Sequence, residues 1–137
     1  VHSIYKNDCM RKGKDLAIFV TGSILEETMR VCEMLERDNI SVKLINVTTI
    51  KPFNVEDIVD TVKEIENLAV IEEHNIYGGL ASIISETITY NGLKARVIPI
   101  GLNDIFAKGY GTYEIVRKVN MLNAQGIYIR LKEALGG

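Results

Sequence analysis

The sequence is poor in the residues that disulfide-rich and metal-binding proteins need. Its 137 residues include only two cysteines and two histidines. Cys9 and Cys32 are too few for a disulfide framework, and neither shares a metal-ligand spacing with His2 or His74. We therefore predict no metal site in this chain, and a reducing, cytoplasmic setting.

An excess of positive charge and a long apolar segment are also absent. Sixteen lysines and arginines stand against eighteen aspartates and glutamates, which gives a formal net charge of -2. Binding to a phosphate backbone calls for a basic excess, so nucleic acid is not expected as the main partner. The apolar runs, such as Leu16 to Val20, are far shorter than the roughly 20 residues that cross a bilayer. We predict no membrane span and no membrane partner.

What remains is the composition of one globular domain. Hydrophobic residues make up 47% of the chain and charged residues 25%, which suits a compact core. The polar segment 1–14 is expected to be a tail or linker, and residues 15–137 the domain. The first residue is valine rather than methionine, so we expect a processed chain or a piece of a longer one.

Apolar runs of strand length alternate with helical patterns along this domain. Ser23 and Glu26 have the spacing of a capping box, which predicts a helix start directly after the first strand. The core-facing stripe of that helix is expected to hold Ile24, Leu25, Thr28, Met29, Cys32 and Leu35. Strands are expected at 16–20, 41–47, 68–73 and 95–100, and helices after Ser23, Asn54 and Gly79 and from caps at Thr112 and Asn123.

This alternation predicts the fold class. Strands that are separated by helices of ten or more residues form parallel pairs, because each crossover returns the chain to the same end of the sheet. We therefore expect an α/β protein, a three-layer α/β/α sandwich with a mostly parallel sheet of about five strands. In such folds the ligand crevice lies at the carboxyl ends of the strands.

Three polar stretches follow the predicted strands at that end, and Glu72-Glu73-His74 is the richest in chemistry. The others are Thr21-Gly22-Ser23 and Asn103-Asp104. Two carboxylates and an imidazole make general acid–base catalysis available. However, Glu72 and Glu73 point to opposite faces of a strand, so only one can join His74 in a single site. This geometry favours a hydrogen-bonded interface or a loop anchor, and we assign no catalytic residue.

Two glycine-containing segments allow a second kind of site. The Gly78-Gly79 pair opens a helix, and the free amides there could hold an anion, although tight strand-to-helix packing explains the pair better. The loop 101–111 contains Asp104 and Lys108, which could meet a phosphate, but a solvated turn is the simpler interpretation. No complete P-loop or G-x-G-x-x-G run is present. We therefore assign no cofactor-binding residue.

Three stretches taken together resemble the C-terminal domain of transketolase. They are Val20-Thr21-Gly22-Ser23, INVTTIKP at 45–52 and IEEHNIYGGLAS at 71–82, and the resemblance spans nearly residues 14 to 135. Similar domains close the beta subunits of thiamine-dependent 2-oxoacid dehydrogenases and the deoxyxylulose-phosphate synthases. Transketolase is favoured by Glu72-Glu73-His74-Asn75 followed by Gly78-Gly79-Leu80. Ala81, where a glycine is common, and Leu102-Asn103-Asp104 depart from the family pattern.

The resemblance implies an activity that this chain does not carry alone. Transketolases move a two-carbon ketol unit between sugar phosphates, in the pentose phosphate pathway. Their thiamine diphosphate and its magnesium or calcium ion lie between two other domains, which supply a Gly-Asp-Gly motif and a glutamate that this chain lacks. We therefore expect no cofactor bound by this domain, and no activity from it in isolation.

The expected role is assembly with the other transketolase domains or subunit and with a homodimer mate, around sugar-phosphate substrates. Glu72, Glu73, His74, Gly78, Gly79 and Asp104 are the candidate interface or ligand residues. Two alternatives stay open. One is a C-terminal domain of a dehydrogenase beta subunit or deoxyxylulose-phosphate synthase, and the other is a stand-alone anion-binding or regulatory module.

Overall fold

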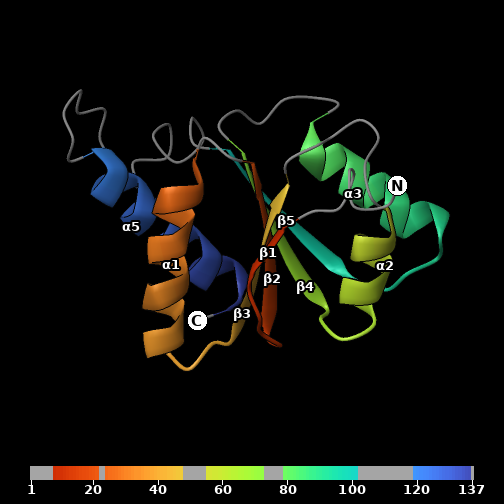
Figure 1. The fold of residues 1–137 in the computed structure, drawn as a ribbon, viewed down its shortest axis with the longest axis horizontal. Helices are drawn as coiled ribbons and strands as arrows, with labels where there is room; N and C mark the ends of the chain where they lie inside the picture. Colours follow the sequence, from red (N-terminus) through yellow and green to blue (C-terminus); the bar gives the residue numbers. More distant parts are fainter. Residues whose placement is uncertain (1–7, 22–23, 48–54, 73–78, 102–118, 137) are drawn as a thin grey trace.

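The computed structural model describes residues 8–21, 24–47, 55–72, 79–101 and 119–136, and for residues 8 and 119–123 the backbone alone. Among the described residues, five strands and four helices alternate along most of the chain (Figure 1). They are β1 (Asp8–Arg11), β2 (Leu16–Thr21), α1 (Leu25–Arg37), β3 (Val42–Val47), α2 (Val55–Val62), β4 (Asn67–Glu72), α3 (Leu80–Tyr90), β5 (Arg96–Gly101) and α5 (Val119–Ala134).

The strands form one sheet with the order β1-β3-β2-β4-β5. β2, β3, β4 and β5 are parallel, and β1 is antiparallel to β3. Helices α1 and α5 lie on one face of the sheet, and α2 and α3 lie on the other (Figure 1). The predicted three-layer α/β/α sandwich with a mostly parallel five-stranded sheet is confirmed.

The core is divided by the sheet into two clusters. Along β2 the side chains alternate, so that Leu16, Ile18 and Val20 join the cluster under α1 and α5. Ala17 and Phe19 join the cluster under α2 and α3. All five are fully buried. A strand that is apolar on both faces needs a helical layer on each side, which explains why the sequence alternates strand and helix.

The sheet begins earlier than the sequence predicts. Residues 8–11 form β1, so the expectation of a tail or linker over 1–14 is wrong for this part of it. β1 is only four residues long, and its register on β3 shifts between Cys9 and Arg11. Such a short, irregular edge strand has no alternation of its own to reveal it. Arg11 also forms an ion pair with Glu36, which connects β1 to α1.

Two predicted helix starts differ from the structure. α1 begins at Leu25 with Ile24 at the N-cap and no side-chain cap hydrogen bond there, whereas Ser23 lies outside the described residues. Asn123 was expected to cap a helix but lies inside α5, which runs unbroken from Val119. The predicted caps Asn54 and Thr112 lie outside the described residues. No helix in the described part of the chain combines the length and the apolarity needed to cross a membrane.

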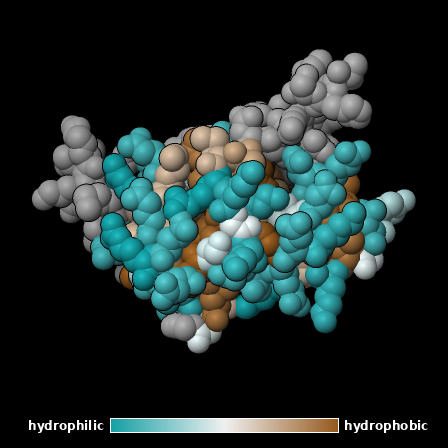
Figure 2. Space-filling view, turned by 60° about the horizontal axis from the view of Figure 1, so that its bottom comes forward, coloured by the Kyte–Doolittle hydropathy of each residue, from teal (hydrophilic) through white to brown (hydrophobic). Residues whose placement is uncertain are grey.

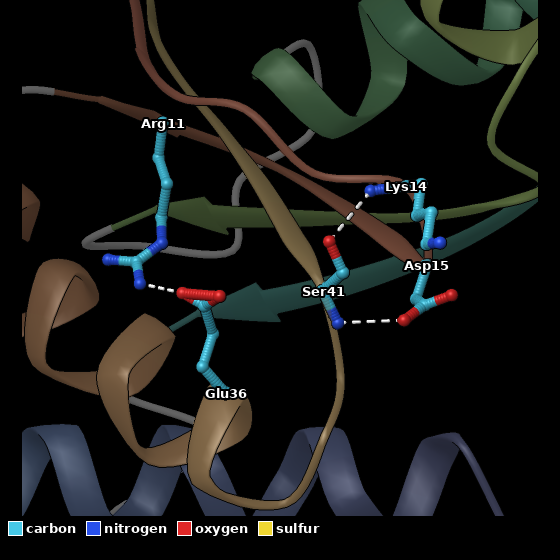
Figure 3. A network of polar contacts seen from close by, with 5 residues as sticks. All are labelled: Arg11, Lys14, Asp15, Glu36 and Ser41. Carbon is cyan, nitrogen blue, oxygen red and sulfur yellow. Dashed lines mark hydrogen bonds and ion pairs between the residues drawn. The ribbon is translucent and has the colours of Figure 1, made fainter.

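The amino ends of β2 and β3 are joined by a set of hydrogen bonds around Ser41 (Figure 3). The Ser41 amide donates to Oδ2 of Asp15 at 2.7 Å, and the Lys14 amide donates to Oγ of Ser41 at 3.2 Å. The Ser41 carbonyl in turn accepts from the amide of Asp15 at 2.8 Å. Hydrophilic residues cover most of the face at this end (Figure 2). The amino end is therefore internally bonded and presents a largely hydrophilic surface.

Gly13 lies where the chain passes close to β3. A Cβ added there would overlap the backbone carbonyl of Val42 and lie 2.6 Å from the amide nitrogen of Lys43. Gly13→Ala should therefore lower the free energy of unfolding by at least about 1–3 kcal/mol, because backbone atoms must shift. Urea denaturation measures this loss. Lys12→Ala at the exposed neighbouring position is the control, and equal stability of the two variants would contradict this packing.

Candidate functional site

The strand order defines where the carboxyl ends of the sheet can form a crevice. The chain passes from β2 to β3 on one side and reaches β4 on the other, so the topological switch point lies between β2 and β4. Val20 pairs with Ile71, which brings the ends of the two strands, Thr21 and Glu72, to the same level. The sequence placed candidate residues on both strand ends, and the sheet makes these ends neighbours.

Glu72 at the end of β4 binds the first turn of α3. Its Oε1 accepts a hydrogen bond from the amide of Leu80 at 2.8 Å, and its Oε2 accepts one from the amide of Ala81 at 3.2 Å. Gly79 occupies the N-cap position with an extended backbone and has no side chain to offer. Helix N-termini leave their first amides without internal partners, and here the carboxylate of the preceding strand supplies them.

This contact determines whether the helix start after Gly79 can bind an external anion. The positive end of the α3 dipole and two of its free amides already face a carboxylate of the same chain. An external anion at the same amides would have to displace Glu72 and overcome its charge. Both carboxylate oxygens of Glu72 are also engaged, so the geometry is that of an anchor rather than of a free acid–base group.

The other candidate residues cannot be placed. Glu73, His74, Gly78 and Asp104 lie outside the described residues, so of the predicted set the structure brings together Glu72 and the turn at Gly79.

Sequence reasoning missed Glu27, a buried carboxyl in the first turn of α1. The predicted core stripe of this helix included Leu25 and Met29, but Leu25 is half-buried and Met29 is 42% exposed. Glu27 and Val31 take their place in the interior, and Glu27 is only 6% exposed. A signal was present, because Glu27 lies four residues before Val31, a helical spacing that places both on one face.

Burial sets the protonation behaviour of Glu27. Loss of hydration raises the pKa of its carboxyl above the ordinary value, and the charge of Glu26 raises this pKa further. The helix backbone and Arg30 act in the opposite direction. Because α1 follows β2, this carboxyl lies at the carboxyl-end side of the sheet, as Glu72 does.

A second buried polar group lies near the end of β3. Oδ1 of Asn46 is buried and has no hydrogen-bond partner among the described residues. Asn46 pairs with Val20 of β2 and lies two residues after Leu44, so its side chain points to the α1 face of the sheet. Asn46 lies in the stretch INVTTIKP at 45–52, but no pattern in the sequence predicts a contact for it.

The resemblance implies a metal ion beside thiamine diphosphate in the complete enzyme, and the described residues offer no cluster of ligands for that ion. Nowhere among them do three His, Cys, Asp or Glu side chains come close enough together to hold a metal ion. Cys32 is buried, and loss of hydration raises the pKa of its thiol to about 11, which leaves it protonated at neutral pH. We therefore derive no cofactor chemistry from these residues.

A hollow of about 740 Å³ lies along the second half of α3 and the start of α2. It includes neither Glu72 nor the turn that Glu72 binds, so it is separate from the strand-end candidate. Among the described residues, it is lined by Val55, Ser85, Glu86, Thr87, Thr89, Tyr90 and Asn91.

The comparison with protein families matches nearly the whole chain. The model of the family described as transketolase, C-terminal domain, matches residues 6–127. The match includes β1 and extends into α5, and so covers every described strand.

Similar proteins are sections, subunits and larger synthases. A Methanocaldococcus jannaschii protein named as a transketolase C-terminal section is 33% identical over 96% of this chain and 40% of its own length. An apulose-4-phosphate transketolase subunit of Actinobacillus succinogenes is 29% identical over 88% of this chain and 39% of its own length. A 1-deoxy-D-xylulose-5-phosphate synthase of Methylacidiphilum infernorum is 32% identical over 84% of this chain, but over 18% of its own length. The chain therefore spans less than half of each of these relatives.

Solved structures share the fold. A split-gene transketolase described as an inactive beta4 tetramer superposes with a TM-score of 0.75 at 24% identity, over 96% of this chain and 41% of its own. A 2-oxoglutarate:ferredoxin oxidoreductase of Magnetococcus marinus has a TM-score of 0.56 at 17% identity, over 93% of this chain and 19% of its own. Both likenesses concern the arrangement of strands and helices.

Glu27 makes the stability of the domain depend on pH. Its pKa is raised in the folded state, so the unfolded chain ionises first and the stability falls as pH rises above the ordinary glutamate value of about 4.3. Glu27→Gln removes this loss. The variant should gain stability over the parent on going from acidic to neutral pH, as urea denaturation measures. Glu33→Gln, exposed on the same helix, is the control, and a stability difference that does not change with pH would contradict the assignment.

Proposed function

This chain belongs to the transketolase C-terminal domain family, and from that premise we propose that it is the C-terminal module of a transketolase. In the complete enzyme a two-carbon ketol unit moves between sugar phosphates, and this module contributes assembly rather than chemistry. The observation that carries the proposal is the family match over residues 6–127. Support comes from two relatives named as a transketolase section and a transketolase subunit, of which this chain covers 40% and 39%.

The proposed partners are the section or subunit that holds thiamine diphosphate with its magnesium or calcium ion, and a homodimer mate. We place this assembly in the cytoplasm and in the pentose phosphate pathway. A rigid α/β module can fix the geometry of a neighbouring site without touching the reacting atoms. The carboxyl ends of the strands are the proposed contact, because the amino ends are bonded to one another and carry mostly hydrophilic residues.

A second candidate is the C-terminal domain of a 1-deoxy-D-xylulose-5-phosphate synthase. A relative with this name is 32% identical to the chain, and the transketolase subunit is 29% identical, so these two identities do not separate the candidates. Transketolase is preferred because the transketolase section relative is 33% identical over 96% of this chain, whereas that synthase is 32% identical over 84% of it. A stand-alone anion-binding module is less well supported, since Glu72 already occupies two amides at the α3 N-terminus.

Reconstitution tests which enzyme the chain completes. The purified chain alone should show no ketol transfer, and mixing it with the cofactor-binding section of the same organism should produce activity. Ketol transfer between sugar phosphates and formation of deoxyxylulose 5-phosphate are assayed in parallel. Ketol transfer by the chain alone would overturn the proposal, and formation of deoxyxylulose 5-phosphate alone would establish the second candidate.

The proposed contact is tested by the double variant Glu73→Ala/His74→Ala in the reconstituted enzyme. Both residues follow β4 at the carboxyl end, so we expect association to weaken by about tenfold or more, measured by calorimetry or by the concentration dependence of turnover. The matched control is Glu66→Ala/Lys94→Ala, which removes one acid and one base at the amino ends of β4 and β5. Equal association of both double variants would count against this interface.

A further inference from the structure

We propose that Glu72 is a positioning residue with two roles. Its carboxylate is the resident anion of the α3 N-terminus, meaning that it occupies the site where an external anion would otherwise bind. By doing so it holds the carboxyl ends of the strands in the geometry that the neighbouring domain or subunit binds. The assembly part of this inference rests on the proposed function. The resident-anion part rests on the two hydrogen bonds of Glu72 alone.

Glu72 stands between two elements that are held independently. β4 pairs with β2 on one side and with β5 on the other, where Glu72 lies opposite Gly101. α3 is held by Leu80, Ile84 and Ile88, which belong to the buried cluster under α2 and α3. The carboxylate of Glu72 therefore connects an inner strand to the first turn of a packed helix.

The acceptor that caps α3 comes from the sheet rather than from the N-cap residue of the helix. A serine or aspartate at position 79 would cap α3 locally and would not orient the helix relative to the sheet. The N-cap is instead Gly79, and the acceptor comes from Glu72, eight residues before Leu80 in the sequence. The same hydrogen bonds that complete the helix end thus also fix its place against β4.

The charge of Glu72 also determines which ligands this helix end accepts. Its carboxylate makes two charge-assisted bonds at the positive end of the dipole, which are stronger than neutral ones. The amides of Leu80 and Ala81 are therefore not available to a sugar phosphate. If Glu72 is truncated, the same amides should accept a small anion from solution.

A comparable contact lies at the other end of the strands, the amino end. Asp15 accepts a hydrogen bond from the amide of Ser41 at 2.7 Å, so it too is a carboxylate bound to a backbone amide (Figure 3). It lies at the amino ends of the strands, away from the proposed contact. Asp15→Ala removes a carboxylate that binds a single amide and no helix N-terminus, and so serves as the control for Glu72→Ala.

The first measurement uses the 137-residue chain alone and formate, the smallest carboxylate, as the probe. Glu72→Ala should lower the midpoint of urea denaturation, and sodium formate should raise this midpoint again, relative to sodium chloride at equal ionic strength. The parent and Asp15→Ala should show no such difference between the salts. Absence of the formate effect in Glu72→Ala would overturn the resident-anion assignment.

The second measurement is the association of each variant with the cofactor-binding section, under conditions where all are folded by circular dichroism. Glu72→Ala should bind the section about tenfold more weakly than the parent does. Glu72→Gln should bind it more tightly than Glu72→Ala, because the glutamine keeps one acceptor oxygen. Asp15→Ala should bind it as the parent does. If Glu72→Ala and Asp15→Ala are equally impaired, or both bind normally, Glu72 has a stabilising role only and the positioning role is wrong.

The two proposals can fail separately. If the parent chain does not bind the section at all, the proposed function fails, while the formate measurement still decides whether Glu72 is the resident anion. Should Glu72→Ala not fold, Glu72→Gln takes its place in the binding measurement. Binding equal to that of the parent would then overturn the positioning role.

Discussion

The inner strands β2 and β4 have no face open to water, and the rest of the architecture depends on this constraint. Leu16, Ile18 and Val20 are buried on one side of β2, and Ala17 and Phe19 on the other. Each face therefore needs its own helical layer, which α1 and α5 supply on one side and α2 and α3 on the other (Figure 1). Inner strands covered in this way expose polar groups only at their ends, which is where a ligand crevice forms in such folds.

The amino and carboxyl ends of the strands differ in their polar contacts. At the amino ends, Asp15 and Ser41 bond to each other through backbone and side chain, and Gly13 allows the chain to pass directly against β3. At the carboxyl ends, the bond runs from Glu72 of the sheet to α3 of a covering layer, and Glu27 lies buried in α1. At the carboxyl end, one carboxyl group thus bonds a strand to a covering helix, and a second is buried in the first turn of α1.

In the proposed function, this chain supports chemistry that other domains perform. The described residues contain no cluster that could hold a metal ion, and among them the carboxylate at the switch point is fully engaged by backbone amides. The chain's membership of the transketolase C-terminal domain family is shown by the match over residues 6–127. In the proposed assembly, the rigidity of the strand-end edge is what this chain would offer its partner.

The sequence by itself determined the repeating elements. Strands and helices are local periodicities, so the runs at Leu16, Val42 and Arg96 and the start of the helix at Leu80 could be placed to within about one residue. Other features needed tertiary contacts. β1 forms by pairing with β3, which lies more than thirty residues away in the sequence. Glu27 rather than Met29 faces the interior, because packing selects which side of α1 is buried. The sequence placed Glu72 at a strand end, but only the folded chain brings its carboxylate to the amides of α3, because that distance is set by the packing of a helix on a sheet.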